Sequence, residues 1–381
     1  MAGRAYLDAG GAAPLTPRVQ EALKKGFEQG WADPWRLASE SRTARLLLQG
    51  ATEAVADVLG ARPEWLHWTP SPHLGFERLL TGIVAARRGR ERVLVSAIER
   101  DALVAAAEHA SPHGLDTIGV SREGHVDLDA LRSALSVPDV SLVAIQHANQ
   151  ELGTVQRLDA VAQATADAGV PLVVDATASI GHIDPPEHWD ALVAHPADWG
   201  GPAGVGVVAL RPQTRWLARW PELPGPGGDG WAPGGVSIPL VLAAAVALQE
   251  REESRQHESA RLSSLIDRIR GTVALIDGID VQGDPVERLP HVLTFSCLYA
   301  DGEALVSRLD REGFAVGSGS ACATGTLEPS RVLAAVGALT HGNVRLALHP
   351  GVPDDEVERF LAVLPRVIDD VRHQVGARGR S

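Results

Sequence analysis

Apolar and polar positions follow two different periods along the first two thirds of the chain. Short apolar runs bounded by polar or turn residues occur at 91–97, 140–148 and 170–176. Such runs are typical of strands that are buried on both faces, as in a parallel sheet. Residues 158–169, between the last two runs, have a helical period and predict a crossover helix. The pattern therefore predicts an α/β fold with a doubly wound sheet covered by helices on both faces.

Helical patterns also flank this region. Residues 16–31 begin with Thr16 as the expected N-cap and Pro17 at the first helical position. Residues 39–61 predict a second amphipathic helix. A long helical stretch at about 238–275 is of the kind that often bridges two domains.

The last hundred or so residues have a mixed pattern of their own. The apolar run at 291–298 predicts a strand, and residues 302–313 and 353–375 predict helices. Together they indicate a smaller α/β domain. Residues 213–236 are rich in Trp, Pro and Gly, so we expect a loop there.

The composition narrows the classes of function. Hydrophobic residues make up 45% of the 381 residues, so we expect a packed globular protein. The net charge of −13 argues against nucleic acid as the main partner, because phosphate binding needs clustered Lys and Arg. No apolar run of about 18 residues indicates a membrane span. Residues 1–11 lack the apolar core of a signal peptide, and we expect a cytoplasmic protein.

The two cysteines have different surroundings. Cys322 lies in 317–337, a loop of Gly, Ser and Ala that leads into a helix expected to begin near Pro329 and Ser330. Small neighbours leave a thiol uncrowded, and a helix N-terminus lowers its pKa and favours the reactive thiolate. A buried structural thiol is the alternative for Cys322. Cys297 lies in an apolar strand pattern, where the structural interpretation is favoured.

The Cys322 loop closely resembles the mobile cysteine loop of cysteine desulfurases, which are class V aminotransferases of the fold type I PLP architecture. Five further segments resemble motifs of that family in the same order, namely 6–19, 147–158, 173–184, 200–212 and 342–350. The resemblance implies a large doubly wound α/β domain at 13–246. It also implies a smaller domain formed by 1–12 with 247–381. The family's active site forms at a dimer interface, which implies a homodimer or a heterodimer with a paralogue.

The resemblance also implies roles for individual residues. In the family, PLP forms an imine with a lysine and then with substrate cysteine. Cys322 would carry the resulting persulfide to a sulfur acceptor. Asp175 would pair with the cofactor's ring nitrogen, and Arg345 would bind the substrate carboxylate. Ser237 falls where a hydroxyl from the partner subunit reaches the cofactor phosphate.

Several positions of the resembled pocket carry a different residue. They are Asp198 for the imine lysine, His195 for a phosphate-binding serine, Ala178 for a glutamine beside the phenolic oxygen, Gln150 for an asparagine, Arg100 for the histidine that stacks on the ring, and His73 for a threonine of the phosphate turn. The chain has two lysines, Lys24 and Lys25. Neither a carboxylate nor a guanidinium can form an imine in place of a lysine. The family resemblance thus implies PLP, whereas the residues at these pocket positions argue against PLP bound as an imine.

Three functions remain open from the sequence. The first is a desulfurase-like protein that no longer uses PLP and keeps Cys322 for sulfur transfer. The second is an active desulfurase or C–S lyase that binds PLP noncovalently. The third is a repurposed enzyme whose cleft uses His73, His195 and Asp198 as polar or acid–base groups for another ligand. These residues with Asp175 also resemble a metal-ligand set. Sequence drift in a pocket that no longer binds a cofactor leaves polar residues of the same kinds. We therefore expect no metal.

Overall fold

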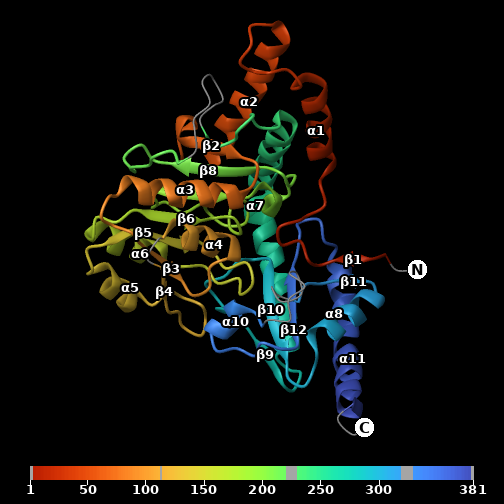
Figure 1. Cartoon of the computed structure of the whole chain (residues 1–381). Helices are drawn as coiled ribbons and strands as arrows, with labels where there is room; N and C mark the ends of the chain where they lie inside the picture. Colours follow the sequence, from red (N-terminus) through yellow and green to blue (C-terminus); the bar gives the residue numbers. More distant parts are fainter. Residues whose placement is uncertain (1–2, 112–113, 220–229, 319–328, 379–381) are drawn as a thin grey trace.

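A seven-stranded sheet forms the centre of the larger part of the molecule (Figure 1). The computed structural model describes residues 3–111, 114–219, 230–318 and 329–378. The strand order is β2-β8-β7-β6-β5-β3-β4, and neighbours are parallel except at β8, which is antiparallel to both β2 and β7. The strands are β2 Leu66–Thr69, β3 Arg92–Ser96, β4 Leu115–Ile118, β5 Val140–Gln146, β6 Leu172–Asp175, β7 Ala191–Ala194 and β8 Gly206–Leu210.

Helices cover both faces of this sheet. Alternate strand residues face opposite ways, so Val143 of β5 packs in one core and Leu142 in the other. The helices on the Val143 side are α1 Pro17–Gln29, α2 Ser39–Val58, α5 Leu128–Leu135, α6 Leu158–Asp167 and the first part of α7 Ile238–Val273. Those on the Leu142 side are α3 Pro72–Ala86 and α4 Asp101–Ala110. The doubly wound α/β arrangement expected from the sequence is confirmed.

A separate apolar core holds the C-terminal part together. It joins Ala5 and Leu7 to residues from the second half of α7 onward. Its elements are β1 Ala5–Tyr6, β9 Ile279–Val281, β10 Val292–Cys297, α8 Gly302–Arg311, β11 Phe314–Ala315, β12 Asn343–Ala347 and α11 Asp354–Arg378. α7 contributes buried residues to this core and to the first, and Figure 1 shows it running from α1 and α2 to β10. The domain boundaries at 12/13 and 246/247 stay predictions.

Local signals in the sequence match the observed element ends. The Thr16 hydroxyl accepts a hydrogen bond from the Val19 amide at 3.3 Å and so caps α1. Ser330 caps the short helix α10 Arg331–Ala335 in the same way. Short 3₁₀ turns, η1 Pro63–Trp65 and η2 Pro196–Trp199, complete the described elements. Within the described part of the chain, no helix combines the length and the apolarity that crossing a bilayer requires.

Candidate functional site

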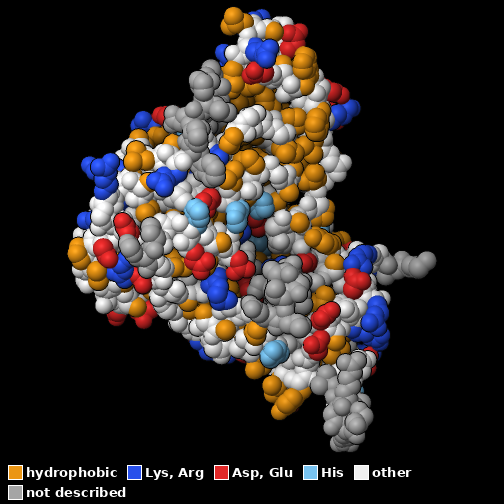
Figure 2. All heavy atoms as spheres, in the orientation of Figure 1, with side chains coloured by type: hydrophobic (Ala, Val, Ile, Leu, Met, Phe, Trp, Pro, Cys, Tyr) orange, Lys and Arg blue, Asp and Glu red, His pale blue; other side chains and the backbone are white. Residues whose placement is uncertain are grey.

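Four ionisable side chains from three segments meet beyond the ends of the central strands. Asp175 ends β6, Arg100 follows β3 and precedes α4, and His195 and Asp198 flank and occupy the turn η2 after β7. In open α/β sheets, the carboxyl ends of parallel strands are where ligand sites form. Figure 2 shows histidine, acidic and basic side chains grouped near the middle of the face it displays. Arg100 pairs with Asp175, His195 pairs with Asp198, and the charge of Asp198 acts on Arg100, so four of the residues singled out from the sequence are neighbours.

Asp175 has both carboxylate oxygens occupied by protein donors. Arg100 donates its Nε proton to Oδ2 across 2.7 Å. Thr177 donates its backbone N–H at 2.9 Å and its hydroxyl at 2.5 Å to Oδ1. The Asp175 side chain is only 2% exposed. A buried carboxylate needs such partners, because removing an ion from water is costly unless it is paired and hydrogen-bonded.

Arg100 lies between two carboxylates. Its backbone is extended, and its side chain is 17% exposed. Burial acts to lower the pKa of Arg100, but the negative charges of Asp175 and then Asp198 outweigh it and raise that pKa. The guanidinium therefore stays charged and links the end of β6 electrostatically to the turn η2.

Asp198 is held from two directions. Its Oδ2 lies 2.7 Å from His195 Nδ1. Its backbone carbonyl accepts a hydrogen bond from His182 Nε2 at 2.8 Å. The indole of Trp199 donates to the Ala244 carbonyl at 3.0 Å and ties η2 to α7. Gly200 then turns the chain with a φ of 91°, which glycine adopts without steric cost.

A neutral histidine pair lies next to this turn. The rings of His182 and His291 stack with their centroids 3.7 Å apart, and both are buried. Burial, followed by the charge of Arg251, lowers the pKa of His182 to about 3. His182 is therefore uncharged at neutral pH and acts as a hydrogen-bond donor to Asp198.

Glu99, the residue before Arg100, is a buried carboxyl. Burial raises the pKa of Glu99 to about 8, and the charge of Asp175 adds to the increase. Its Oε1 accepts hydrogen bonds from the Ser96 hydroxyl at 2.5 Å and the Gln146 amide at 3.1 Å. A protonated Glu99 at neutral pH adds no negative charge beside Asp175.

Arg345 lies on β12 and faces the N-terminal turn. Its Nη2 donates to Asp8 at 2.8 Å, and its Nε is buried without a partner among the described residues. A Cβ on Gly10 would lie 3.7 Å from Arg345 Nη2, and one on Gly11 would lie 3.9 Å from Asp198 Oδ1. Of these two adjacent glycines, Gly10 thus lies beside Arg345 and Gly11 lies beside Asp198.

Four further predicted site residues, all within the described ranges, take no part in these hydrogen bonds. Ala178 is buried in the turn after β6, and Gln150 is partly buried after β5. His73 is exposed in the first turn of α3, and Ser237 is exposed at the N-cap of α7. Within the described ranges, no side-chain hydrogen bond or ion pair links His73, Gln150 or Ser237 to Asp175 or Asp198. Cys322 lies outside the described residues, so its role stays a prediction.

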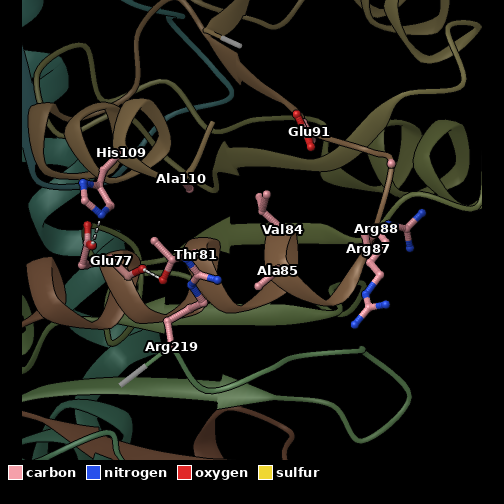
Figure 3. A pocket seen from close by; sticks show the side chains of 11 residues that line it. Glu77, Thr81, Val84, Ala85, Arg87, Arg88, Glu91, His109, Ala110 and Arg219 are labelled. Carbon is pink, nitrogen blue, oxygen red and sulfur yellow. Dashed lines mark hydrogen bonds and ion pairs between the residues drawn. The ribbon is translucent and has the colours of Figure 1, made fainter. Parts of the chain in front are cut away.

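Two other features involve residues outside the group of Asp175, Arg100, His195 and Asp198. His125, Asp284 and Glu287 place possible metal-ligand atoms within 4.8 Å of one another, but Arg157 also pairs with Glu287 at 2.7 Å. A cavity of about 520 Å³ lies along α3 and α4 (Figure 3). Its lining includes Glu77, which pairs with His109 at 3.3 Å. None of the residues singled out from the sequence lines this cavity.

Sequence reasoning missed several residues that shape the cleft. Thr177 was detectable, since an aspartate side chain commonly accepts a hydrogen bond from the backbone N–H two residues further on. Glu99 was adjacent in the chain to Arg100, but its burial was not readable. His182 and Asp8 gave no usable signal, because their partners Asp198 and Arg345 are distant in sequence.

Comparisons with known proteins agree with the geometry. The family model for aminotransferase class V matches residues 5–229 and 234–360. The chain is 31% identical over 378 residues to cysteine desulfurase IscS 1 of Archaeoglobus fulgidus, covering 96% of this chain and 97% of that protein. It is 30% identical over 381 residues to a cysteine desulfurase of Cereibacter sphaeroides, covering 97% of each.

Solved structures share the fold. A NifS-like protein superposes with a TM-score of 0.87 at 22% identity, covering 96% of this chain and 99% of the other. The apo structure of a cysteine desulfurase from Thermococcus onnurineus NA1 gives 0.85 at 20% identity, covering 96% and 95%. The fold type expected from the sequence is therefore confirmed. The chain belongs to the class-V aminotransferase family and, within it, to the cysteine desulfurase family.

Proposed function

We propose that this protein is a cysteine-desulfurase-like sulfur-transfer protein in which Cys322 accepts sulfur as a persulfide and the cleft does not use lysine-bound PLP. One observation carries the proposal. Asp198, in the position that the family resemblance gives to the imine lysine, is a carboxylate hydrogen-bonded to His195. The retained Cys322 loop supplies the sulfur-transfer half of the proposal.

The residues of the cleft do not fit PLP held as a lysine imine. Both lysines of the chain, Lys24 and Lys25, are exposed on α1. A carboxylate cannot form an imine, and Asp198 would repel the cofactor phosphate. Asp175, the expected partner of the ring nitrogen, already has both oxygens engaged. We therefore derive no chemical step through PLP.

Sulfur transfer needs only the thiolate of Cys322 and a donor that already carries sulfane sulfur. The thiolate attacks the terminal sulfur of a donor persulfide, and a new S–S bond forms on Cys322. The donor's own S–S bond breaks, and the donor leaves as a thiolate. No oxidant or reductant is consumed. A protein of this kind would pass the sulfur on to an acceptor by the same exchange.

The proposed partners include a second subunit. Large apolar side chains are exposed on α1, on α2 and between them, namely Phe27, Trp31, Trp35, Leu37 and Leu46. Exposed apolar groups gathered in this way are typical of a surface covered by a partner. They support a homodimer or a heterodimer with a paralogue. Light scattering coupled to gel filtration distinguishes a monomer from either dimer.

A second candidate function uses the cleft itself. The carboxylate–imidazole pair of Asp198 and His195 is a geometry that orients a ring for proton transfer. It supports a repurposed enzyme acting through His195 on another ligand. His73, which we expected to take part, is exposed and is not linked to the pair. An active desulfurase that binds PLP noncovalently is the remaining alternative.

The test of the main proposal follows sulfur on the protein. The purified chain is treated with cysteine persulfide, and separately with free cysteine and PLP, and intact mass is recorded. We expect one added sulfur on Cys322 with the persulfide donor, and no alanine from free cysteine. Cys322→Ser should abolish the added mass, whereas Cys297→Ser, which changes a buried thiol, should not. Equal labelling of wild type and Cys322→Ser would overturn the role of Cys322.

A further inference from the structure

Arg100 crosses a strand to reach Asp175. Arg100 follows β3, Asp175 ends β6, and β5 lies between these strands in the sheet. Neighbouring strands are about 4.8 Å apart, so the pair spans two strand intervals, roughly 10 Å. Arginine can bridge this span because its aliphatic stem carries the guanidinium well away from the backbone. The 2.7 Å bond between Arg100 Nε and Asp175 Oδ2 shows that the reach is complete.

The pair leaves Asp175 with no need of a ligand. Arg100 and Thr177 together occupy both of its oxygens. Asp175 is buried, and a buried carboxylate without a cation is unstable. Since Oδ1 already accepts two hydrogen bonds, an incoming ring N–H would have to compete with Arg100 for Oδ2.

The groups packed around the pair include one further carboxylate and two neutral side chains. Asp198 is the second carboxylate near Arg100, and it is bonded to His195. Burial lowers the pKa of His182 to about 3 and raises the pKa of Glu99 to about 8, so both are neutral at pH 7. Arg100 is thus the permanent cation between Asp175 and Asp198.

We propose that Arg100 is a built-in cation that takes the place of the cofactor's charged ring nitrogen, so that the cleft folds and remains stable without PLP. Asp175 is then kept as a structural partner of Arg100, and its presence does not signal cofactor binding. This inference deepens the proposed function and rests on it for the identity of the excluded cofactor. It assigns Arg100, in addition to Asp198, a direct part in that exclusion.

The first experiment restores the family's histidine at position 100 and its lysine at position 198, singly and together. Wild type, Arg100→His, Asp198→Lys and the double variant are titrated with PLP, reduced with borohydride and analysed by intact mass and peptide mapping. We expect a saturable, reducible adduct at position 198 only in the double variant, because Arg100 still occupies Asp175 in Asp198→Lys. An equal adduct in Asp198→Lys alone would overturn the proposal. So would a folded double variant without any adduct.

A second experiment tests the ion pair by stability alone. The Tm is measured for Arg100→Met, Asp175→Asn and the two combined. We expect the double variant to lose less than the sum of the single losses, because each single change leaves a buried group without its partner. Additive losses, or a rise in the wild-type Tm on adding PLP, would contradict the inference. Neither experiment involves Cys322, so failure of persulfide transfer and failure of the Arg100 assignment are separate results.

Discussion

His182 donates its Nε2 proton to the backbone carbonyl of Asp198 across 2.8 Å. A carbonyl can only accept, so the bond fixes the proton on Nε2. The imidazole is buried and stacked on His291, which leaves it little freedom to turn. The position of Asp198 in the cleft therefore depends on a histidine outside the group of charged residues.

Replacing His182 by Ala should destabilise the protein by about 1–3 kcal/mol, because the Asp198 carbonyl loses its donor and a ring-sized gap opens. Urea unfolding followed by circular dichroism measures the change. His188→Ala, which alters an exposed histidine, is the control and should change stability little. Equal stability of the two variants would show that the His182 bond contributes nothing.

Glu99 should make stability fall as pH rises. Burial raises the pKa of Glu99 from 4.5 to about 8, so the folded state holds its proton where the unfolded state has lost it. Between these two values the unfolded chain binds fewer protons, and the free energy of unfolding falls by up to about 1.4 kcal/mol per pH unit. Glu99→Gln should remove this component. The check is urea unfolding of both proteins at several pH values; parallel curves would refute the assignment.

His147 should make the free energy of unfolding fall as the pH is lowered into the acid range. Burial lowers the pKa of His147 to about 4, so the folded state rejects a proton that the unfolded state accepts below about 6.5. Its stabilising contribution is complete above that value and is lost as pH falls toward 4. His147→Gln should retain a hydrogen-bonding group for Ser179. It should reduce the slope of the free energy of unfolding against pH in the acid range by the contribution of about one proton, roughly 1.4 kcal/mol per pH unit. The same slope in wild type and His147→Gln would contradict the assignment of this pH dependence to His147.

Gly11→Ala should destabilise the protein by about 1–2 kcal/mol, since Gly11 has a φ of 80° that L-residues adopt only with strain. The added Cβ would also lie 3.9 Å from Asp198 Oδ1. Gly50→Ala is the matched control, because Gly50 is exposed within α2 and a Cβ there meets nothing within 4 Å. That change should stabilise by roughly 0.5–1 kcal/mol. Thermal unfolding of both variants decides the matter, and shifts of the same sign would contradict the strain at Gly11.

Local patterns were sufficient for much of the fold. The apolar runs located β3, β5 and β6, and the helical period located α6 between the last two. Thr16 was readable as a cap because its hydroxyl bonds an amide three residues away. Cys297 was expected to be buried, and burial raises the pKa of Cys297 to about 12. Each of these depends on neighbours in the chain, which the sequence contains directly.

The site was readable only in part. Asp175, Asp198, His195 and Arg100 were all singled out from motif positions, but their contacts were not. Arg100 bonds Asp175 across 75 positions of chain, and this contact exists because β5 pairs with both β3 and β6. Strand order follows from how whole elements pack, and a local period carries no information about it. The sequence by itself thus determined which residues could do chemistry, and only the tertiary structure decided that Arg100 satisfies Asp175 from within the chain.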